Sequence, residues 1–174
     1  PIRIPSSVGE GSISGARILI VEDEAIVARD IQTRLREVGY EADWVAASGE
    51  EAVRFAKEAN PHLVLMDISL GDGIDGVETV AQIHATCDTP IVFITGYTDE
   101  ASLARAKLSA PYGYIVKPVQ TLELRVSIEI AMHRYQLQSQ LNELNRCLST
   151  TLASIGDGVI STDSRGVVKI ANRV

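Results

Sequence analysis

The stretch Leu63-Val-Leu-Met-Asp67-Ile-Ser69-Leu70 decides the fold of this chain, because four apolar residues run directly into an aspartate. Pro61 precedes the run and Gly71-Asp-Gly73 follows it, which is the pattern of a short strand buried on both faces. Such a strand leaves Asp67 at its carboxyl end, where open α/β sheets bind their ligands. On this stretch alone two interpretations stay open. In the first, Asp67 only caps the following turn. In the second, a cation or a covalent modification neutralises its charge.

Five short apolar runs alternate with helix-like segments between residues 16 and 134. In the first such segment Val27, Ile31, Leu35 and Val38 recur at steps of four and three, which is the helical period. Strands that alternate with helices form a parallel sheet with right-handed crossovers. The predicted fold class is therefore α/β, with a doubly wound five-stranded parallel sheet. The predicted strands are Arg17–Val21, Ala42–Ala46, Leu63–Met66, Pro90–Ile94 and Gly113–Val116, and the predicted helices span 25–38, 48–59, 76–85 and 98–107.

Composition narrows the class of function. A 45% apolar content with 22% charged residues indicates a packed core rather than general disorder. The net charge of −7 argues against a nucleic-acid-binding surface, which needs clustered Lys and Arg. Cys87 and Cys147 lack metal-ligand spacing and are interpreted as reduced thiols of a cytoplasmic protein. No apolar run approaches the roughly 20 residues of a membrane span, so no membrane association is expected.

Polar groups follow four of the five predicted strands: Glu22 and Asp23, Asp67, Thr95, and Lys117. The carboxyl ends of parallel strands share one edge of a sheet, so these groups can meet there. Three carboxylates repel one another unless a cation compensates, and Mg²⁺ prefers oxygen ligands. Lysine adds a point charge for a carboxylate or a phosphoryl oxygen, and a hydroxyl can donate to either. This set predicts Mg²⁺-dependent acceptance of a phosphoryl group on Asp67.

These pieces resemble the receiver domains of two-component response regulators. The resemblance covers about residues 16–134 and implies a flavodoxin-like receiver fold that takes a phosphoryl group from the phosphohistidine of a histidine kinase or phosphotransfer protein. The matching motifs are Ile18-Leu-Ile-Val-Glu-Asp-Glu24, Leu65-Met-Asp67, Phe93-Ile-Thr-Gly96 and Tyr114-Ile-Val-Lys-Pro118, in the family's order and spacing.

The resemblance also implies roles at the metal site. Asp67 would be the phospho-acceptor, Asp23 a direct Mg²⁺ ligand, and Glu22 a ligand acting through water. The backbone carbonyl of Ser69 would be a further ligand. Many family members have Asp-Asp where this chain has Glu22-Asp23, a difference that concerns the metal geometry.

A second group of roles concerns switching after phosphorylation. The resemblance implies that Thr95 is the switch hydroxyl, Lys117 contacts the phosphoryl group and Tyr114 is the rotating aromatic residue. Ser69 and Tyr97, two residues beyond Asp67 and Thr95, would tune the lifetime of the phosphoryl group. The Lys117–Pro118 bond is expected to be cis, as in the family.

The helical pattern that begins at Thr121 continues beyond the length of a receiver. Leu137, Leu141, Leu144, Leu148, Thr151 and Ile155 follow alternating steps of four and three, which is a heptad seam. We predict a signalling helix or coiled coil over residues 135–153 that supports a parallel homodimer, together with a face of the receiver. The alternative is a single amphipathic helix docked on another domain.

Residues 154–174 alternate apolar side chains around two glycine-containing turns and resemble the opening hairpin of a PAS sensor domain. This fragment is expected to be too short to fold alone. Residues 1–15 are predicted to be a flexible leader or tag remnant. Because no initiating Met is present, we expect a piece of a longer protein whose output region lies outside this sequence.

Two other functions stay open beside the phosphorylation switch. One is a receiver scaffold that mediates dimerisation without phosphorylation. The other is a metal-dependent phosphatase, although Ser69 stands where the Asp-x-Asp enzymes carry their second aspartate. A glycine fingerprint for nucleotides is absent after the first predicted strand. Enzymatic activity is expected only as self-phosphorylation and self-dephosphorylation, in a regulator or in a hybrid histidine kinase. His62, His84 and His133 are interpreted as structural.

Overall fold

The computed structural model describes residues 15–71, 73–96, 105, 109–154, 160–162, 164–165 and 167–171. The chain divides into two compact units, Pro1–Arg134 and Tyr135–Val174. The predicted leader lies outside the described residues except for Gly15, and so does the predicted helix over 98–107 except for Arg105.

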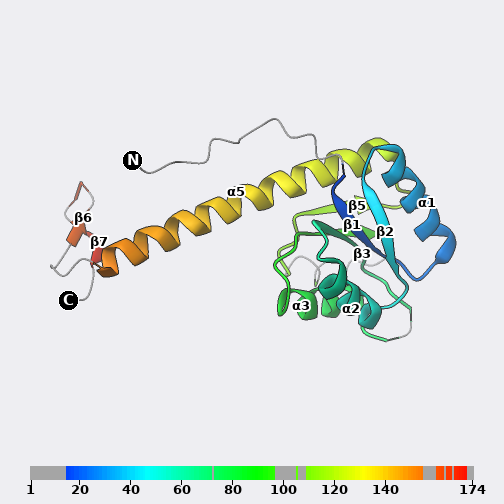
Figure 1. The fold of residues 1–174 in the computed structure, drawn as a ribbon, viewed down its shortest axis with the longest axis horizontal. Coiled ribbons are helices and arrows are strands. Elements are labelled where there is room, and N and C mark those ends of the chain that lie inside the picture. The colour runs from blue at the N-terminus through cyan, green and yellow to red at the C-terminus, as the bar shows by residue number, and fades with distance from the viewer. Residues whose placement is uncertain are drawn as a thin grey trace. The chain divides into compact units, whose positions relative to one another are not determined.

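The first unit is a five-stranded parallel sheet with the strand order β2-β1-β3-β4-β5 (Figure 1). This order and the alternation of strands with helices confirm the predicted doubly wound α/β fold. The strands are β1 (Arg17–Val21), β2 (Glu41–Ala46), β3 (Leu63–Asp67), β4 (Ile91–Thr95) and β5 (Gly113–Val116), and the helices are α1 (Ala25–Glu37), α2 (Gly49–Ala59), α3 (Gly76–His84) and α5 (Thr121–Ser154), which continues into the second unit.

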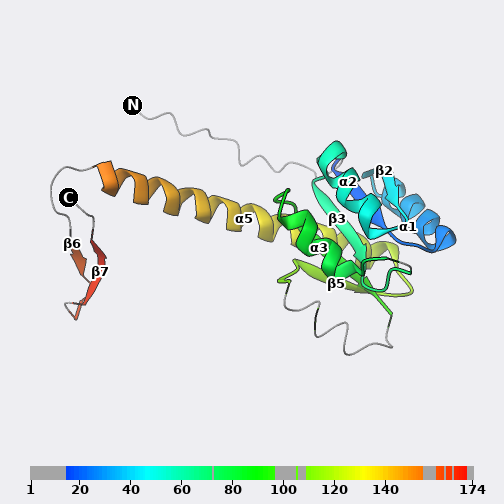
Figure 2. The same ribbon diagram turned by 90° about the horizontal axis from the view of Figure 1, so that it is seen from below.

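Helices cover both faces of the sheet (Figures 1 and 2). On one face Ile31 and Leu35 of α1 and Leu124 and Ile128 of α5 pack against the side chains of alternate strand residues such as Ile20. On the other face α2 and α3 pack through apolar residues such as Ala52, Ala56, Val80 and Ile83. All five residues of β3 are buried, as expected for the central strand of a parallel sheet.

Strands β3 and β4 each continue one residue further than the sequence pattern predicts, to Asp67 and Thr95. The reason is the hydrogen-bonded ladder. The Ile68 N–H donates to the Ile94 carbonyl at 3.2 Å, and the Lys117 N–H donates to the Thr95 carbonyl at 2.8 Å. The polar strand ends are therefore held in register by backbone hydrogen bonds.

Two details of the local geometry support these elements, and the second confirms a prediction. Ser48 caps α2, and its hydroxyl accepts a hydrogen bond from the Glu51 N–H. The Lys117–Pro118 peptide bond is cis.

The second unit contains the later part of α5 and an antiparallel pair of strands, β6 (Ile160–Thr162) and β7 (Val168–Ala171). Leu137, Leu141, Leu144 and Leu148 on α5 are 49–56% exposed. Ile155, the last residue of the predicted heptad seam, lies outside the described residues. The PAS-like character of the hairpin and the pairing of the helix stay predictions.

Candidate functional site

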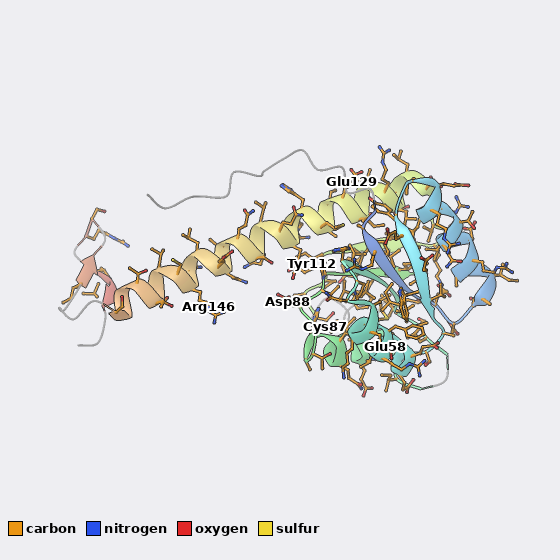
Figure 3. All side chains as sticks on the ribbon, viewed as in Figure 1. Glu58, Cys87, Asp88, Tyr112, Glu129 and Arg146 are labelled. Carbon is orange, nitrogen blue, oxygen red and sulfur yellow. The ribbon has the colours of Figure 1, made fainter. Side chains whose placement is uncertain are left out.

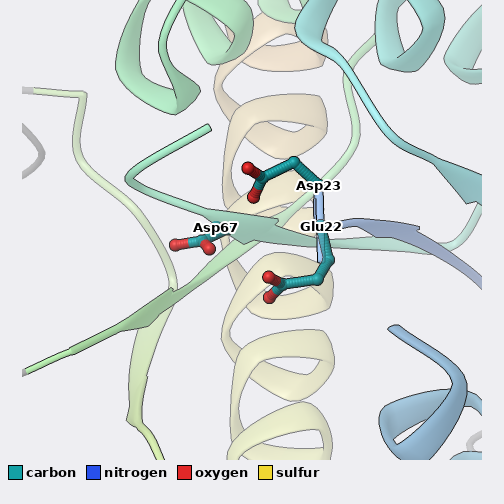
Figure 4. Close-up of side chains that lie close together, drawn as sticks. All are labelled: Glu22, Asp23 and Asp67. Carbon is teal, nitrogen blue, oxygen red and sulfur yellow. The ribbon is translucent and has the colours of Figure 1, made fainter. Parts of the chain in front are cut away.

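The ends of β1 and β3 bring three carboxylates together (Figure 4). Residues Val21 and Met66 are register partners, so the residues that follow them, Glu22 and Asp67, leave the sheet at the same level. Glu22 is 1% exposed and Asp67 is 4% exposed, whereas Asp23 faces solvent. One carboxylate oxygen from each of the three residues lies within 4.8 Å of the other two.

This donor set suits a hard divalent cation. Mg²⁺ binds oxygen ligands, uses one or two carboxylates and retains several waters, so a pocket that is half buried and half open fits its chemistry. Each of the three residues offers a carboxylate oxygen, and the exposed Asp23 leaves one side of the cluster open to water.

Lys117 reaches the same pocket from the end of β5. Its Nζ lies 2.8 Å from Asp67 Oδ2, 2.8 Å from Glu22 Oε2 and 3.1 Å from Glu22 Oε1. The lysine therefore bridges the two buried carboxylates and offsets part of their charge.

The pKa values reflect this arrangement. Burial raises the pKa of Glu22 to about 7, with the hydrogen bond from Lys117 acting in the opposite direction and the charge of Asp67 adding to the rise. Burial by itself would lower the pKa of Lys117, but the hydrogen bonds to Asp67 and Glu22 outweigh it, so that pKa is raised. The pocket therefore attracts positive charge.

The loop after β3 approaches the carboxylates through its backbone. The Ser69 N–H donates to Asp67 Oδ1 at 3.1 Å. A Cβ atom at Gly71 would lie 2.9 Å from Asp23 Oδ2, and one at Gly76 would collide with the Asp67 carbonyl oxygen. Sequence reasoning missed the importance of these two glycines, although glycines closely following a strand-end aspartate are a signal for close backbone approach.

The predicted switch residues lie on the neighbouring strands. The Thr95 hydroxyl donates to the Gly96 carbonyl at 2.9 Å rather than to the acidic cluster. The Tyr114 ring stacks on Phe93 with centroids 6.0 Å apart, and its buried hydroxyl has no hydrogen-bond partner among the described residues. The structure thus gathers Glu22, Asp23, Asp67, Ser69 and Lys117 but leaves Thr95 and Tyr114 outside that set. Tyr97 lies outside the described residues.

A family model described as the response regulator receiver domain matches residues 18–129. The chain belongs to the response-regulator receiver family. Receiver domains bind Mg²⁺ at an acidic pocket and interact with histidine kinases or phosphotransfer proteins, and this chain has a cluster of three carboxylates that could hold a metal ion.

Individual relatives agree with this assignment. The transcriptional regulatory protein PdtaR of Mycobacterium tuberculosis is 33% identical over 151 residues, which cover 84% of this chain and 73% of that protein. The transcriptional regulatory protein ResD of Bacillus subtilis is 32% identical over 126 residues, or 72% of this chain and 52% of that protein.

Solved structures show the same similarity. The receiver domain of a modulated diguanylate cyclase from Desulfovibrio desulfuricans G20 is 42% identical with a TM-score of 0.68, covering 72% of this chain and 99% of that one. The N-terminal domain of a response regulator/sensory box/GGDEF protein from Carboxydothermus hydrogenoformans is 35% identical with a TM-score of 0.65, covering 71% and 98%. Among the described residues of this receiver, no helix is long and apolar enough to cross a membrane.

Proposed function

We propose that this receiver accepts a phosphoryl group from a phosphohistidine onto Asp67. The observation that carries the proposal is the partly buried Lys117 ammonium, which lies 2.8 Å from both Asp67 and Glu22 beside a third carboxylate. Mg²⁺ would be held by Asp23, Asp67 and the Ser69 carbonyl, with Glu22 acting through water. The partner that supplies the phosphoryl group would be a histidine kinase or a phosphotransfer protein.

In this mechanism one oxygen of Asp67 forms a bond to phosphorus while the phosphorus–nitrogen bond of the donor histidine breaks. Lys117 is positioned to neutralise a phosphoryl oxygen, because its ammonium group already lies against Asp67 Oδ2. The Ser69 N–H holds the other oxygen, Oδ1, and so orients the carboxylate. Mg²⁺, when bound, would neutralise further negative charge on the transferring group.

Phosphorylation would then reorganise the neighbouring strand ends. The added charge and oxygens at Asp67 would attract the Thr95 hydroxyl, which at present donates only to the adjacent Gly96 carbonyl. Tyr114 would turn towards the space that Thr95 leaves, which is consistent with a buried hydroxyl that lacks a partner among the described residues. The side chains of Ser69 and Tyr97 would modulate hydrolysis.

The test is Mg²⁺-dependent modification with acetyl phosphate or beryllofluoride, followed by intact mass spectrometry. We expect wild-type protein to gain one phosphoryl group with acetyl phosphate, and Asp67→Asn to gain none. Folded wild-type protein that binds Mg²⁺ but is never labelled would refute the phospho-acceptor function. It would favour a receiver scaffold that works without phosphorylation.

The same proposal includes a homodimer formed through the later part of α5. Four half-exposed leucines, Leu137, Leu141, Leu144 and Leu148, follow the heptad spacing. An isolated helix gains little stability in water without a packed apolar face, so a partner for this seam is expected. A face of the receiver would add to the contact and would couple it to phosphorylation.

The downstream region would be a PAS-like module. Its support is the β6–β7 hairpin after α5 and the relative from Carboxydothermus hydrogenoformans, whose name combines a response regulator with a sensory box. We further propose a cytoplasmic site of action without nucleic-acid binding by this segment, consistent with the free Cys87 and Cys147 and the net charge of −7.

Light scattering after size-exclusion chromatography tests the dimer, with and without beryllofluoride. Leu141→Asp, which places a charge in the seam, should yield monomers. Asn142→Asp adds the same charge outside the seam and should leave the molar mass of the assembly unchanged. Substitution of Arg146, which also lies outside the seam positions, should have no effect either (Figure 3). Equal masses for Leu141→Asp and wild-type protein would refute pairing through this seam.

A further inference from the structure

The described residues of the loop between β3 and α3, 68–71 and 73–75, lie against two carboxylates of the site. The Ser69 N–H donates to Asp67 Oδ1, and the Gly71 backbone approaches Asp23 so closely that an added Cβ would lie 2.9 Å from Oδ2. A small displacement of this loop would therefore move the acceptor and a ligand relative to each other.

The amino-terminal turn of α2 contacts this loop from outside the site. A Cβ at Gly73 would lie 3.1 Å from Glu50 Oε1 and 3.2 Å from Oε2, so the Glu50 carboxylate lies directly against the loop. The Ile74 N–H also interacts with this carboxylate and lowers the pKa of Glu50. At the preceding residue, a Cβ on Gly49 would lie 2.5 Å from Ile74 Cγ1, so the Ile74 side chain packs onto the helix backbone.

Neighbouring polar groups favour the charged form of Glu50. Its own backbone N–H lowers the pKa of Glu50 most, the Ile74 N–H and the Ser48 hydroxyl lower it further, and burial acts in the opposite direction. Ser48 also caps α2 through the Glu51 N–H. The carboxylate is thus anchored to a helix that packs on the sheet through Ala52 and Ala56.

We propose that Glu50 is a positioning residue for the phospho-acceptor site. By holding Gly73 and Ile74 against the start of α2, it keeps the backbone of Ser69 and Gly71 against Asp67 and Asp23. This role rests on the proposed function, because it concerns the same Mg²⁺ site. Mg²⁺ requires near-ideal octahedral geometry, so a loosened loop lowers its affinity and slows phosphorylation.

Two variants separate the contact from the charge. Glu50→Gln removes the charge but keeps an oxygen that can accept from the Ile74 N–H. Glu50→Asp keeps the charge but withdraws the carboxylate by one methylene. Glu50→Ala removes both, and Glu58→Ala provides the matched control, because Glu58 is exposed near the other end of the same helix (Figure 3).

The full chain is used to measure Mg²⁺ dissociation constants by calorimetry and labelling rates with acetyl phosphate by intact mass. We expect Glu50→Ala and Glu50→Asp to bind Mg²⁺ about three- to tenfold more weakly and to be labelled correspondingly more slowly, the effect of losing one typical hydrogen bond. Glu50→Gln and Glu58→Ala should stay within about twofold of wild type. Circular dichroism and urea unfolding without Mg²⁺ establish that each variant is folded.

The opposite pattern would overturn the proposal. If Glu50→Asp matches wild type while Glu50→Gln binds more weakly, Glu50 acts only through its charge. If Glu50→Ala binds Mg²⁺ as tightly as Glu58→Ala does, Glu50 has no positioning role. If Glu50→Ala fails to fold, the comparison of Glu50→Asp with Glu50→Gln tests the proposal instead. Wild-type protein that binds Mg²⁺ without being labelled refutes the phospho-acceptor function but leaves the Glu50 comparison valid on Mg²⁺ affinity alone. Folded wild-type protein that does not bind Mg²⁺ overturns both.

Discussion

Removing the Lys117 ammonium should destabilise the protein without Mg²⁺ and much less with it. Lys117 Nζ lies 2.8 Å from an oxygen of each buried carboxylate, and the Glu22 side chain is fully buried. In Lys117→Met these carboxylates lose their counter-charge. Loss of one partner from a fully buried ion pair costs about 3–5 kcal/mol. Because the Lys117 side chain is 24% exposed, we expect a smaller loss, about 2–4 kcal/mol, in the free energy of unfolding.

Mg²⁺ should reverse much of this loss. The ammonium group occupies the side of the pocket that faces Asp67 and Glu22 and repels a cation, so Lys117→Met should bind Mg²⁺ about tenfold more tightly than wild type. At saturating Mg²⁺ the bound charge replaces that of the lysine, and the difference in unfolding free energy should fall below half its value in EDTA.

Urea unfolding at pH 7.5, followed by the fluorescence of Trp44, the only tryptophan of the chain, measures both quantities. Lys57→Met is the matched control, because Lys57 is exposed on α2 and its loss should change the free energy by less than about 0.5 kcal/mol. A loss in EDTA no larger than that of the control would refute the bridging role of Lys117. An equal loss with and without Mg²⁺ would refute the idea that the two cations share one pocket.

Two further predictions concern protonation and close packing. The pKa of Glu22 is about 7 in the folded, metal-free protein against an ordinary value of 4.5, so the folded state binds more protons between these values. Stability in EDTA should therefore fall as the pH rises from about 4.5 to 7, and Glu22→Gln should have a flatter profile over this range; parallel profiles would contradict the assignment. Gly76→Ala should lose about 2–4 kcal/mol because its Cβ would meet the Asp67 carbonyl, which a chemical denaturation curve measures. In Gly113→Ala the nearest atom to the added Cβ would be 3.7 Å away on Val92, so this control should change stability by less than about 1 kcal/mol. Similar losses for both variants would show that the close approach at Gly76 is unimportant.

Much of the fold follows from local sequence pattern. The apolar runs that end at Asp67 and Thr95 predict buried strands, and the steps of four and three from Val27 to Val38 predict α1. Both signals are local, because a strand buried on two faces and a helix buried on one require characteristic spacings of apolar residues. The strand ends differ by only one residue from prediction, since the final ladder hydrogen bonds depend on neighbouring strands.

The sequence also determined which residue types could meet. Parallel strands end at one edge, so Glu22, Asp23, Asp67 and Lys117 could be assigned to one site before any distance was known. Their types, three acids and one base, pointed to a cation and a phosphoryl group. Only the tertiary structure decided that Lys117 bridges both buried carboxylates and that Thr95 donates elsewhere.

The contacts of the loop after β3 belong wholly to the tertiary structure. Glu50 lies 17 positions before Asp67 on an ordinary amphipathic helix, and no local pattern distinguishes it from Glu51 or Glu58. Its role depends on how α2 packs beside the loop, and the need for glycine at position 76 depends on how closely α3 approaches the end of β3. A sequence determines periodicity and residue type, whereas distances between residues far apart in the chain arise only when whole elements pack against one another.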